Sequence, residues 1–409
     1  MPQGSRLDTE GIFTWHPTVG GMHAIKDAVH DYVEVDGVAQ DLLDTPAMQR
    51  LRHVKQLSTV RLVYPSASHT RFEHSLGVYH LACQALAHLG IDGARAEAVR
   101  AAALLHDVGH GPYGHQTERI IERRLGRHHD DVHHVLEDSA LAGVLESHGL
   151  APDVVAGLIA GDGKLGQLVS GDLDVDRMDY LVRDAHHTGV PYGTVDPGRL
   201  VRVLRFVDGT LALEEGNVAT AESLLVARAL MNATVYRHHV SRIAGSMLER
   251  AGERLLDGTD LDPETFARMT DAELLASLRE YEATANVADR LVERRLYKRA
   301  VWAELEAVPE LVLESDVGET RALEREVAAA ADVDPSAVIV DCPGRPSMPE
   351  TETRVVVGGS VRRLHEQSPL VQGLQAAQRA QWRLGVYAPA AVQDDVAAAA
   401  EQVLGLETE

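Results

Sequence analysis

The residues best suited to chemistry lie in one short segment, residues 104–115, which reads LLHDVGHGPYGH. The apolar stretch before it predicts a buried helix that delivers His106 and Asp107 to its C-terminal end, and the glycine-rich turn returns His110 and His115 toward the same place. Polar groups at the end of a dry helix are unfavourable unless they are paired or bind a metal. Imidazole and carboxylate donors suit a divalent transition metal (Fe, Mn, Co, Ni or Zn) better than Ca or Mg. We therefore predict a metal centre here.

Two other segments carry side chains that could complete this centre. Residues 68–77 read SHTRFEHSLG, and residues 172–184 read DLDVDRMDYLVRD. In the second segment Asp176, Tyr180 and Asp184 recur at helical spacing and share one face. Such a polar stripe usually marks a solvated helix face, and it becomes functional only where that face meets the histidine-rich segment.

A longer pattern, His74 followed by His106-Asp107 and then Asp176, resembles the HD-domain metal phosphohydrolases. One branch is matched closely, the dGTPase-like deoxynucleoside triphosphate triphosphohydrolases, which include the HD domain of the vertebrate SAM-and-HD restriction factor. The matching strings are residues 44–46, 49–52, 55–57, 71–77, 106–112 and 174–180. The resemblance covers residues 22–250 well and the last 150 loosely. It implies a helical HD core and a metal held by His74, His106, Asp107 and Asp176.

The resemblance also implies a reaction. The metal would bind a water and the α-phosphate, and attack on the α-phosphorus would release deoxynucleoside and intact triphosphate, with room for an additional Mg²⁺ on the triphosphate. His115 would act as general acid at the 5′-oxygen, and His110 would stabilise phosphate charge. Relatives also have a later catalytic histidine followed by glutamate. That pair is absent from residues 128–137, where either His133 or His134 could fill the role.

Seven residues match substrate contacts of the same family: Gln56, Arg71, Arg177, Tyr180, Asp184, Arg228 and Tyr236. Arg71 would approach the α-phosphate. Arg177 keeps a cation where lysine is common, although a guanidinium fork is not equivalent to an ammonium group. Tyr180 would exclude a 2′-hydroxyl, and Asp184 would accept from the 3′-hydroxyl of a deoxyribose. For Arg228 and Tyr236 a structural role fits equally well.

Asp44, Gln49 and Arg52 match positions that bind an activating guanine nucleotide in relatives. A helix cap and an intrahelical ion pair would explain Asp44 and Arg52 equally well. A nucleotide activator, and assembly into a homo-oligomer (a dimer or a tetramer), are therefore hypotheses that rest on the resemblance.

The elements that must position these residues follow from hydrophobic periodicity and from helix caps. Asp44 is expected to be the N-cap of the first helix. Helices are predicted over residues 44–57, 70–90, 94–107, 116–125, 172–187 and 219–257. Helix starts follow at Asp262-Pro263 and at Thr270, where Glu273 completes a capping box. Strands are predicted around the Asp208-Gly209 turn within residues 200–213, and at 337–340, 353–357 and 385–387.

These elements predict a mainly α fold, an HD-domain helical core with a smaller α+β C-terminal lobe. We expect an irregular tail over residues 1–21, the HD catalytic domain over 22–257 and the α+β lobe over 258–409. Neither internal repeats nor low-complexity tracts interrupt this organisation.

Composition limits the classes of function. The chain of 409 residues has 62 acidic against 39 basic residues and a net charge of −23, which argues against a broad nucleic-acid-binding face. The sequence contains no run of about 18 apolar residues, which a membrane-spanning helix would need. Its two cysteines cannot build a disulfide framework. We expect a cytoplasmic protein. The acidity and the scarcity of lysine fit a halophile's cytoplasm and a GC-rich genome equally well.

Three functions compete on this sequence. The first is hydrolysis of a deoxynucleoside triphosphate substrate to deoxynucleoside and triphosphate. The second is another HD-type phosphohydrolase, a phosphodiesterase or a nucleotidase. The third is a nucleotide-sensing regulatory protein with a disabled site, and the presence of all four metal-ligand residues argues against it.

Overall fold

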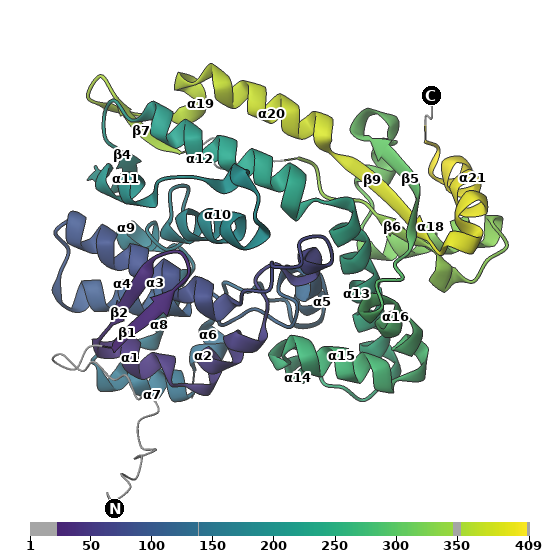
Figure 1. Ribbon diagram of the computed structural model, residues 1–409, viewed down its shortest axis with the longest axis horizontal. Helices are drawn as coiled ribbons and strands as arrows, with labels where there is room; N and C mark the ends of the chain where they lie inside the picture. The colour runs from purple at the N-terminus through teal and green to yellow at the C-terminus, as the bar shows by residue number, and fades with distance from the viewer. Residues whose placement is uncertain (1–22, 138, 347–352, 407–409) are drawn as a thin grey trace, which may run out of the picture.

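The computed structural model describes residues 23–137, 139–346 and 353–406, and helices make up most of it, which confirms the mainly α fold (Figure 1). A short hairpin, β1 (His23–Asp27) and β2 (Asp31–Val35), comes first. The helices that follow are α1 (Gly37–Leu43), α2 (Pro46–Arg50), α3 (Arg71–His88), α4 (Gly93–Leu105), α5 (His115–Leu125), α6 (His133–Leu136), α7 (Ala140–Ser147), α8 (Pro152–Ile159), α9 (Gly163–Gly166) and α10 (Val175–Thr188). The expected tail over residues 1–21 lies outside the described residues.

Helices α3, α4 and α10 form the centre of the HD part, because α3 packs against both of the others. Helix α4 is buried along its second half, as its run of alanine and leucine predicts. Helix α3 begins with a capping box in which Thr70 and Glu73 satisfy each other's backbone N–H groups. As a result, the start of α3, the end of α4 and the start of α10 are held together at one place.

The prediction of one helix over residues 44–57 is wrong. Asp44 is the C-cap of α1, and Thr45 precedes Pro46 at the start of α2. Helix α2 ends at Arg50 and passes into a 3-10 turn, η1 (Leu51–His53). The backbone then runs alongside residues 69–71, because the amide of Arg71 donates to Val54 and that of Gln56 donates to His69. This extended pairing replaces the helix and places Gln56 beside Arg71.

The prediction of one long helix over residues 219–257 is also wrong in one respect, because this segment forms two helices. Helix α12 (Val218–Met231) runs into a π-helical turn, η4 (Asn232–Tyr236), and α13 (His239–Gly258) begins after it. His238 has an extended ψ, and its Nδ1 caps the amide of Val240. Before this pair of helices lie η3 (Pro191–Gly193), α11 (Pro197–Arg202) and the predicted hairpin, β3 (Leu204–Val207) and β4 (Thr210–Leu213).

The last third of the chain contributes to two sheets. Strands β5, β9 and β6 form one sheet, and β7 pairs in parallel with β4, so the chain returns to the HD part (Figure 1). The capping box at Thr270 is present. The elements are α14 (Pro263–Arg268), α15 (Asp271–Glu280), α16 (Glu282–Val292), β5 (Lys298–Glu304), α17 (Glu310–Leu313), α18 (Val317–Ala330), β6 (Ile339–Asp341), β7 (Arg354–Val357), β8 (Ser360–Arg363), α19 (Leu364–Gln367), α20 (Pro369–Gln381), β9 (Arg383–Ala388) and α21 (Gln393–Leu404).

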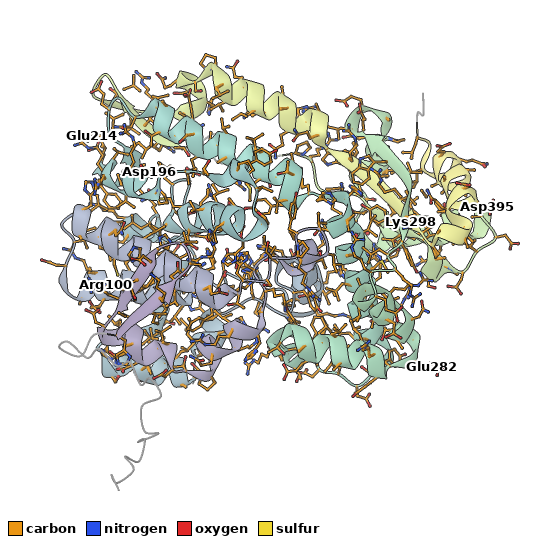
Figure 2. The ribbon with its side chains drawn as sticks, in the orientation of Figure 1. Arg100, Asp196, Glu214, Glu282, Lys298 and Asp395 are labelled. Carbon is orange, nitrogen blue, oxygen red and sulfur yellow. The ribbon has the colours of Figure 1, made fainter. Side chains whose placement is uncertain are left out.

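Three hydrophobic clusters hold these elements. The largest surrounds α3, α4 and α10, the second lies between α5, α13 and α14–α16, and the third lies beneath β5, β6 and β9. Charged side chains such as Glu214, Glu282 and Asp395 lie at the rim of the view in Figure 2. Within the described ranges, none of the helices combines the length and the apolar character that a membrane crossing requires.

Candidate active site

The four residues predicted to bind a metal come together from three helices. His74 lies in the first turn of α3, His106 and Asp107 follow the end of α4, and Asp176 lies in the first turn of α10. The Nε2 atom of His74 is 2.8 Å from Asp176 Oδ1 and 3.3 Å from His106 Nε2. The Nε2 atom of His106 is also 3.5 Å from Asp107 Oδ1. His74, His106 and Asp107 can offer ligand atoms within 4.8 Å of one another.

The Nδ1 atoms of His74 and His106, on the side of each ring away from the cluster, already have hydrogen-bond partners. These bonds determine the direction in which the Nε2 atoms point. Nδ1 of His74 donates to Asp179 Oδ2 at 2.8 Å, and Nδ1 of His106 donates to the carbonyl of Ala103 at 2.9 Å. Both Nε2 atoms therefore face the centre of the cluster. Bonds of this kind orient the histidine ligands of metal sites.

The electrostatics of the cluster also fit a cation. Burial alone would lower the pKa of His74, but hydrogen bonds to Asp176 and Asp179 outweigh it and raise that pKa to about 10. Hydrogen bonds from His106 and His74 hold the pKa of the Asp176 carboxyl below its usual range despite burial. The cluster thus attracts positive charge, and a divalent transition metal would satisfy this demand while both Nε2 lone pairs serve as ligands.

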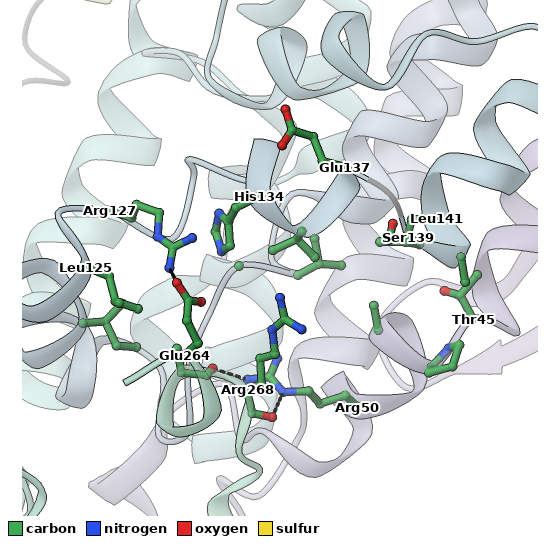
Figure 3. A pocket seen from close by; sticks show the side chains of 18 of the residues that line it. Thr45, Arg50, Leu125, Arg127, His134, Glu137, Ser139, Leu141, Glu264 and Arg268 are labelled. Atoms are coloured by element: carbon green, nitrogen blue, oxygen red, sulfur yellow. Dashed lines mark hydrogen bonds and ion pairs between the residues drawn. The ribbon is translucent and has the colours of Figure 1, made fainter. Parts of the chain in front are cut away.

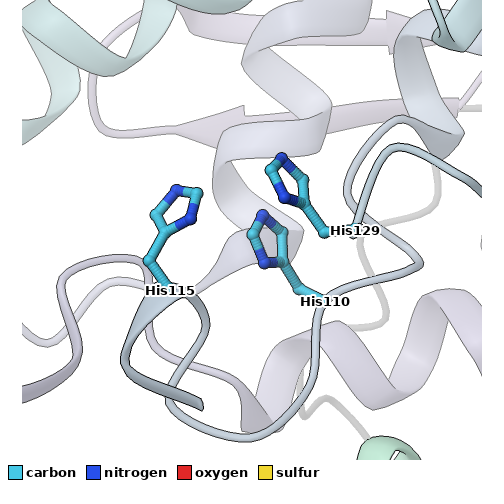
Figure 4. A group of neighbouring side chains, drawn as sticks. All are labelled: His110, His115 and His129. Atoms are coloured by element: carbon cyan, nitrogen blue, oxygen red, sulfur yellow. The ribbon is translucent and has the colours of Figure 1, made fainter. Parts of the chain in front are cut away.

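A second histidine group lies beside the first. His110, His115 and His129 are close neighbours (Figure 4): the rings of His110 and His129 are stacked 3.9 Å apart, and His115 lies edge-on to both. The carboxylate of Glu118 accepts from Nδ1 of His115 at 2.7 Å and from Nδ1 of His129. This carboxylate orients two imidazoles at once and leaves both Nε2 atoms for other partners.

Of the histidines near residue 130, the structure places His129 in this group, whereas the predicted His133 and His134 lie apart from it. His133 is half exposed and faces Asp153 at 3.5 Å. His134 lines a separate pocket of about 490 Å³ beside Arg127 and Glu264, which pair with each other (Figure 3). The resemblance described above offered one signal for His129, because a carboxylate residue, Asp130, follows it directly.

Two close backbone approaches allow this arrangement. A Cβ atom on Gly109 would lie 2.1 Å from the carbonyl oxygen of His129, so only glycine lets the His129 loop come this near. A Cβ atom on Gly114, where φ is +52°, would lie 2.5 Å from the guanidinium of Arg71. Arg50 supports the same loop by donating to the carbonyl of His110 at 2.6 Å. The sequence reasoning missed this role of Arg50 and that of Glu118.

Arg71 links the two histidine groups. Its side chain is 2% exposed, and Nη1 donates to Asp107 Oδ2 at 2.8 Å. Its Nε and Nη2 atoms are buried without a hydrogen-bond partner. Buried guanidinium donors are stabilised by an anionic acceptor, and phosphate oxygens match their geometry. The arrangement therefore suits a phosphoryl group beside the metal cluster.

Two adjoining cavities extend from this point. The smaller, of about 140 Å³, contains the metal cluster, and the larger, of about 310 Å³, lies beyond it. Both are lined by Gln56, Arg71, His115 and Tyr180. The larger cavity is also lined by three further predicted contact residues, Asp184, Arg228 and Tyr236.

The larger cavity has an ordered polar wall. Asp184 accepts from Nε2 of His69 and from the hydroxyl of Tyr236, both at 2.8 Å. The rings of Tyr180 and Tyr236 meet edge-on with centroids 6.2 Å apart. Arg177 is placed differently, since its Nη1 donates to the carbonyl of Asp172 at 3.1 Å and it lines neither cavity.

The three residues matched to a nucleotide activator lie away from these cavities. Nε of Arg52 donates to Gln49 Oε1 at 2.9 Å, and its guanidinium stacks over the ring of Phe72. Nε2 of Gln49 donates to the carbonyl of Leu43 at 2.7 Å. In place of the intrahelical ion pair considered for Arg52, the structure shows its bond to the neutral side chain of Gln49.

The sequence of this chain matches known protein families. The HD domain family matches residues 71–184, and the HD associated region matches residues 195–409. Protein MJ1154 of Methanocaldococcus jannaschii is 31% identical over 90% of this chain and 79% of its own length. A deoxynucleoside triphosphate triphosphohydrolase SAMHD1 homolog of Dictyostelium discoideum is 30% identical over 67% of this chain, and protein YwfO of Bacillus subtilis is 39% identical over 55%. The chain spans 59% and 54% of the lengths of these two relatives.

Two solved structures share the fold over nearly all of the chain. A hypothetical protein from Aquifex aeolicus has a TM-score of 0.74 and 26% identity, covering 92% of this chain and 99% of its own. A phosphohydrolase from Bacteroides thetaiotaomicron has a TM-score of 0.71 and 25% identity, covering 90% and 100%. With both family regions in order and metal-compatible donors at the junction of α3, α4 and α10, the chain belongs to the HD-domain metal-dependent phosphohydrolases that carry an HD-associated region.

Proposed function

We propose that the protein hydrolyses deoxynucleoside triphosphates to deoxynucleoside and triphosphate. A divalent transition metal, held by His74, His106, Asp107 and Asp176, would supply a Lewis acid for a phosphoryl oxygen and an activated water. The observation that carries the proposal is Arg71, whose two unpartnered guanidinium donors stand between the metal donors and the larger cavity.

In this proposal Arg71 binds an oxygen of the reacting phosphate and orients it. His115 gives a proton to the 5′-oxygen of the leaving deoxynucleoside, because Glu118 holds its Nδ1–H and leaves Nε2 directed away. His129 shares the same carboxylate and replaces His133 and His134 as the later catalytic histidine. Burial and the charge of Arg71 hold the pKa of His110 well below its ordinary value, so this ring remains neutral. It therefore stabilises the charge of the phosphate as a hydrogen-bond partner.

The larger cavity would receive the nucleoside and the outer phosphates. Asp184 accepts two hydrogen bonds and, as a carboxylate, has capacity for a further bond from a sugar 3′-hydroxyl. Tyr180 and Tyr236 bound the space around the sugar, and Gln56 lines both cavities. Arg228 provides a cation for the outer phosphates, and Arg177 adds to the positive potential from the start of α10.

Product analysis tests this proposal. The purified protein is incubated with each of the four dNTPs and, as controls, the four rNTPs, in the presence of Mn²⁺. We expect triphosphate and deoxynucleoside from dNTPs, little turnover of rNTPs, and loss of activity with EDTA or in the His106→Ala, Asp107→Ala double variant. Release of pyrophosphate or monophosphate would instead favour another HD-type phosphohydrolase, and absence of any turnover would favour a nucleotide-sensing protein.

A further inference from the structure

Beyond the four metal donors, one buried carboxylate collects an unusual number of hydrogen bonds. Asp179, one turn after Asp176 on α10, has a side chain with no exposed surface. Its Oδ2 accepts from His74 Nδ1 and from Arg183 Nε, each at 2.8 Å. Its Oδ1 accepts from Arg183 Nη2 at 3.0 Å and from Nε2 of His30 at 2.6 Å. Four donors therefore fix both oxygens of the group that orients His74.

Two of these connections lead to the β1–β2 hairpin, which lies outside the matched HD domain region. His30 belongs to the turn of this hairpin. Asp27, at the end of β1, accepts from Arg183 Nη1 at 2.8 Å and from Nη2 at 3.2 Å. Asp27 also accepts from the backbone amides of Val29 and His30, so the turn is fixed on the same carboxylate.

Helix packing is adapted to this network. A Cβ atom on Gly77 of α3 would lie 1.9 Å from Asp179 Oδ1 and 2.4 Å from Arg183 Nη2. Glycine at this position allows α3 and α10 to approach closely enough for His74 to reach Asp179. A network that served only to seal the core would not need to converge on the ring nitrogen of a metal-donor histidine.

The charges of the network also favour a metal. Asp27 and Asp179 bring two buried carboxylates against the single cation of Arg183. A carboxylate on the Nδ1–H of a histidine strengthens Nε2 as a ligand and fixes the ring. The excess negative charge thus acts through His74 on the cation beyond it.

We propose that the β1–β2 hairpin is a functional part of the metal centre, in which His30 and Asp27 are positioning residues that hold Asp179, and through it His74, ready to bind a divalent cation. This inference rests on the metal site of the proposed function. It extends the site to a segment some 40 residues before the first metal donor, in which His30 donates to a carboxylate that never touches the metal.

Titration of the metal-free protein with Co²⁺, followed by the visible absorption of the bound ion, tests this inference. His30→Leu removes the donor, His30→Gln restores an N–H near the Nε2 position, and His23→Leu is a control at an exposed site on the same hairpin. We expect His30→Leu to weaken Co²⁺ binding by about 10-fold or more, His30→Gln to recover most of it, and His23→Leu to match the wild type. The thermal midpoint of each metal-free variant is measured in parallel.

Asp27→Asn provides a second measurement with little change of shape, and we expect it also to weaken Co²⁺ binding. Wild-type affinity in both His30→Leu and Asp27→Asn would overturn the inference. So would equal losses in His30→Leu and His30→Gln that follow their thermal midpoints, since these would indicate a structural role only. A wild-type protein that binds Co²⁺ no better than His106→Ala would overturn the metal centre itself, and the inference with it.

Discussion

At the scale of single residues, Arg71 and Glu118 determine how the site can work. Arg71 donates a hydrogen bond from one guanidinium nitrogen to Asp107, and its other two nitrogens remain as buried donors for an anion. Glu118 holds His115 and His129 by their Nδ1 atoms, which fixes the tautomer of both rings. In the proposed reaction, Arg71 therefore binds the phosphate and Glu118 sets the direction of proton transfer.

Arg71→Lys tests the first role. Lysine keeps the charge but cannot hold Asp107 and donate to a phosphate oxygen in one plane. We expect kcat/KM for a dNTP to fall by about 10²-fold or more, with a small change in thermal midpoint. Steady-state kinetics check this, with Arg279→Lys, an exposed arginine on α15, as the matched control. Unchanged kcat/KM in Arg71→Lys would contradict the role of the guanidinium fork.

Glu118→Gln tests the second role through pH. Burial opposes ionisation of Glu118, but hydrogen bonds with His115 and His129 lower its pKa below the ordinary value of 4.5. A carboxyl group whose pKa is lower in the folded than in the unfolded protein stabilises the fold at pH values above its unfolded pKa. This stabilisation is lost progressively as the pH falls below about 4.5. We therefore expect the difference in unfolding free energy between wild type and Glu118→Gln to shrink from pH 5 to pH 3.

Urea unfolding at a series of pH values measures this difference. Glu122→Gln, on the same helix but about half exposed, is the control and should show a much weaker dependence. A difference between wild type and Glu118→Gln that stays constant below pH 4.5 would mean that the carboxylate is not held by the histidines.

At the scale of elements, the site depends on how closely α3 approaches α10. Gly77 lies on the buried face of α3, where the side chains of Asp179 and Arg183 fill the space that a methyl group would need. The capping box at Thr70 starts α3 at the correct residue, so His74 falls one turn inside the helix. A shift of either helix would separate His74 from Asp176.

Gly77→Ala makes this contact too crowded. We expect a destabilisation of about 1–3 kcal/mol from overpacking, together with weaker metal binding. Gly143→Ala is the matched control, because Gly143 lies inside α7 with nothing within 4 Å of the added Cβ. That change should instead stabilise the protein by about 0.5–1 kcal/mol. Denaturant unfolding measures the free energy of unfolding of both variants. A neutral or stabilising effect of Gly77→Ala would contradict the close packing.

At the scale of the whole molecule, the net charge of −23 is compatible with the proposed phosphate site because arginines lie at that site. Arg71 and Arg228 line the larger cavity, whereas acidic residues such as Glu214, Glu282 and Asp395 lie at the rim of the view in Figure 2. Repulsion among surface carboxylates is reduced by salt, since the Debye length falls to about 3 Å at 1 M. The halophile hypothesis from composition therefore remains a prediction about salt.

We expect the thermal midpoint to rise as KCl increases from low to molar concentration. Screening of carboxylate repulsion is the physical reason. Calorimetry at constant pH measures the midpoint, and NaCl and KCl are compared to separate screening from ion-specific effects. A midpoint that is already maximal in low salt would leave a GC-rich genome as the explanation of the composition.

Assembly is a further property of the whole molecule, and the predicted activator is tested with it. If Asp44, Gln49 and Arg52 bind a guanine nucleotide between subunits, dGTP should shift the protein to a larger species. Size-exclusion chromatography with light scattering, with and without dGTP, measures this. Arg52→Ala should abolish the shift without changing the metal donors, and an unchanged mass with dGTP would contradict nucleotide-driven assembly.

The sequence by itself determined the local features of this protein. The fold class, the buried helix α4, the capping box at Thr270 and the hairpin at Asp208-Gly209 depend on neighbours a few residues apart, which periodicity and caps reveal. The motif His74, His106-Asp107 and Asp176 could also be predicted, because it resembles the motif of the HD-domain metal phosphohydrolases. The breaks after Arg50 and after Tyr236 could not, since pairing of residues 54–56 with 69–71 and a π-helical turn override helical periodicity.

Only the tertiary structure decided which distant side chains meet. The sequence left His133 and His134 as the candidates near residue 130, whereas the close approach at Gly109 brings His129 to the histidine group. The bond from His30 to Asp179 joins residues 149 positions apart, and no local pattern encodes it. The physical reason is the same in each case: a glycine without a side chain permits one close contact, and buried polar groups then require specific partners across it.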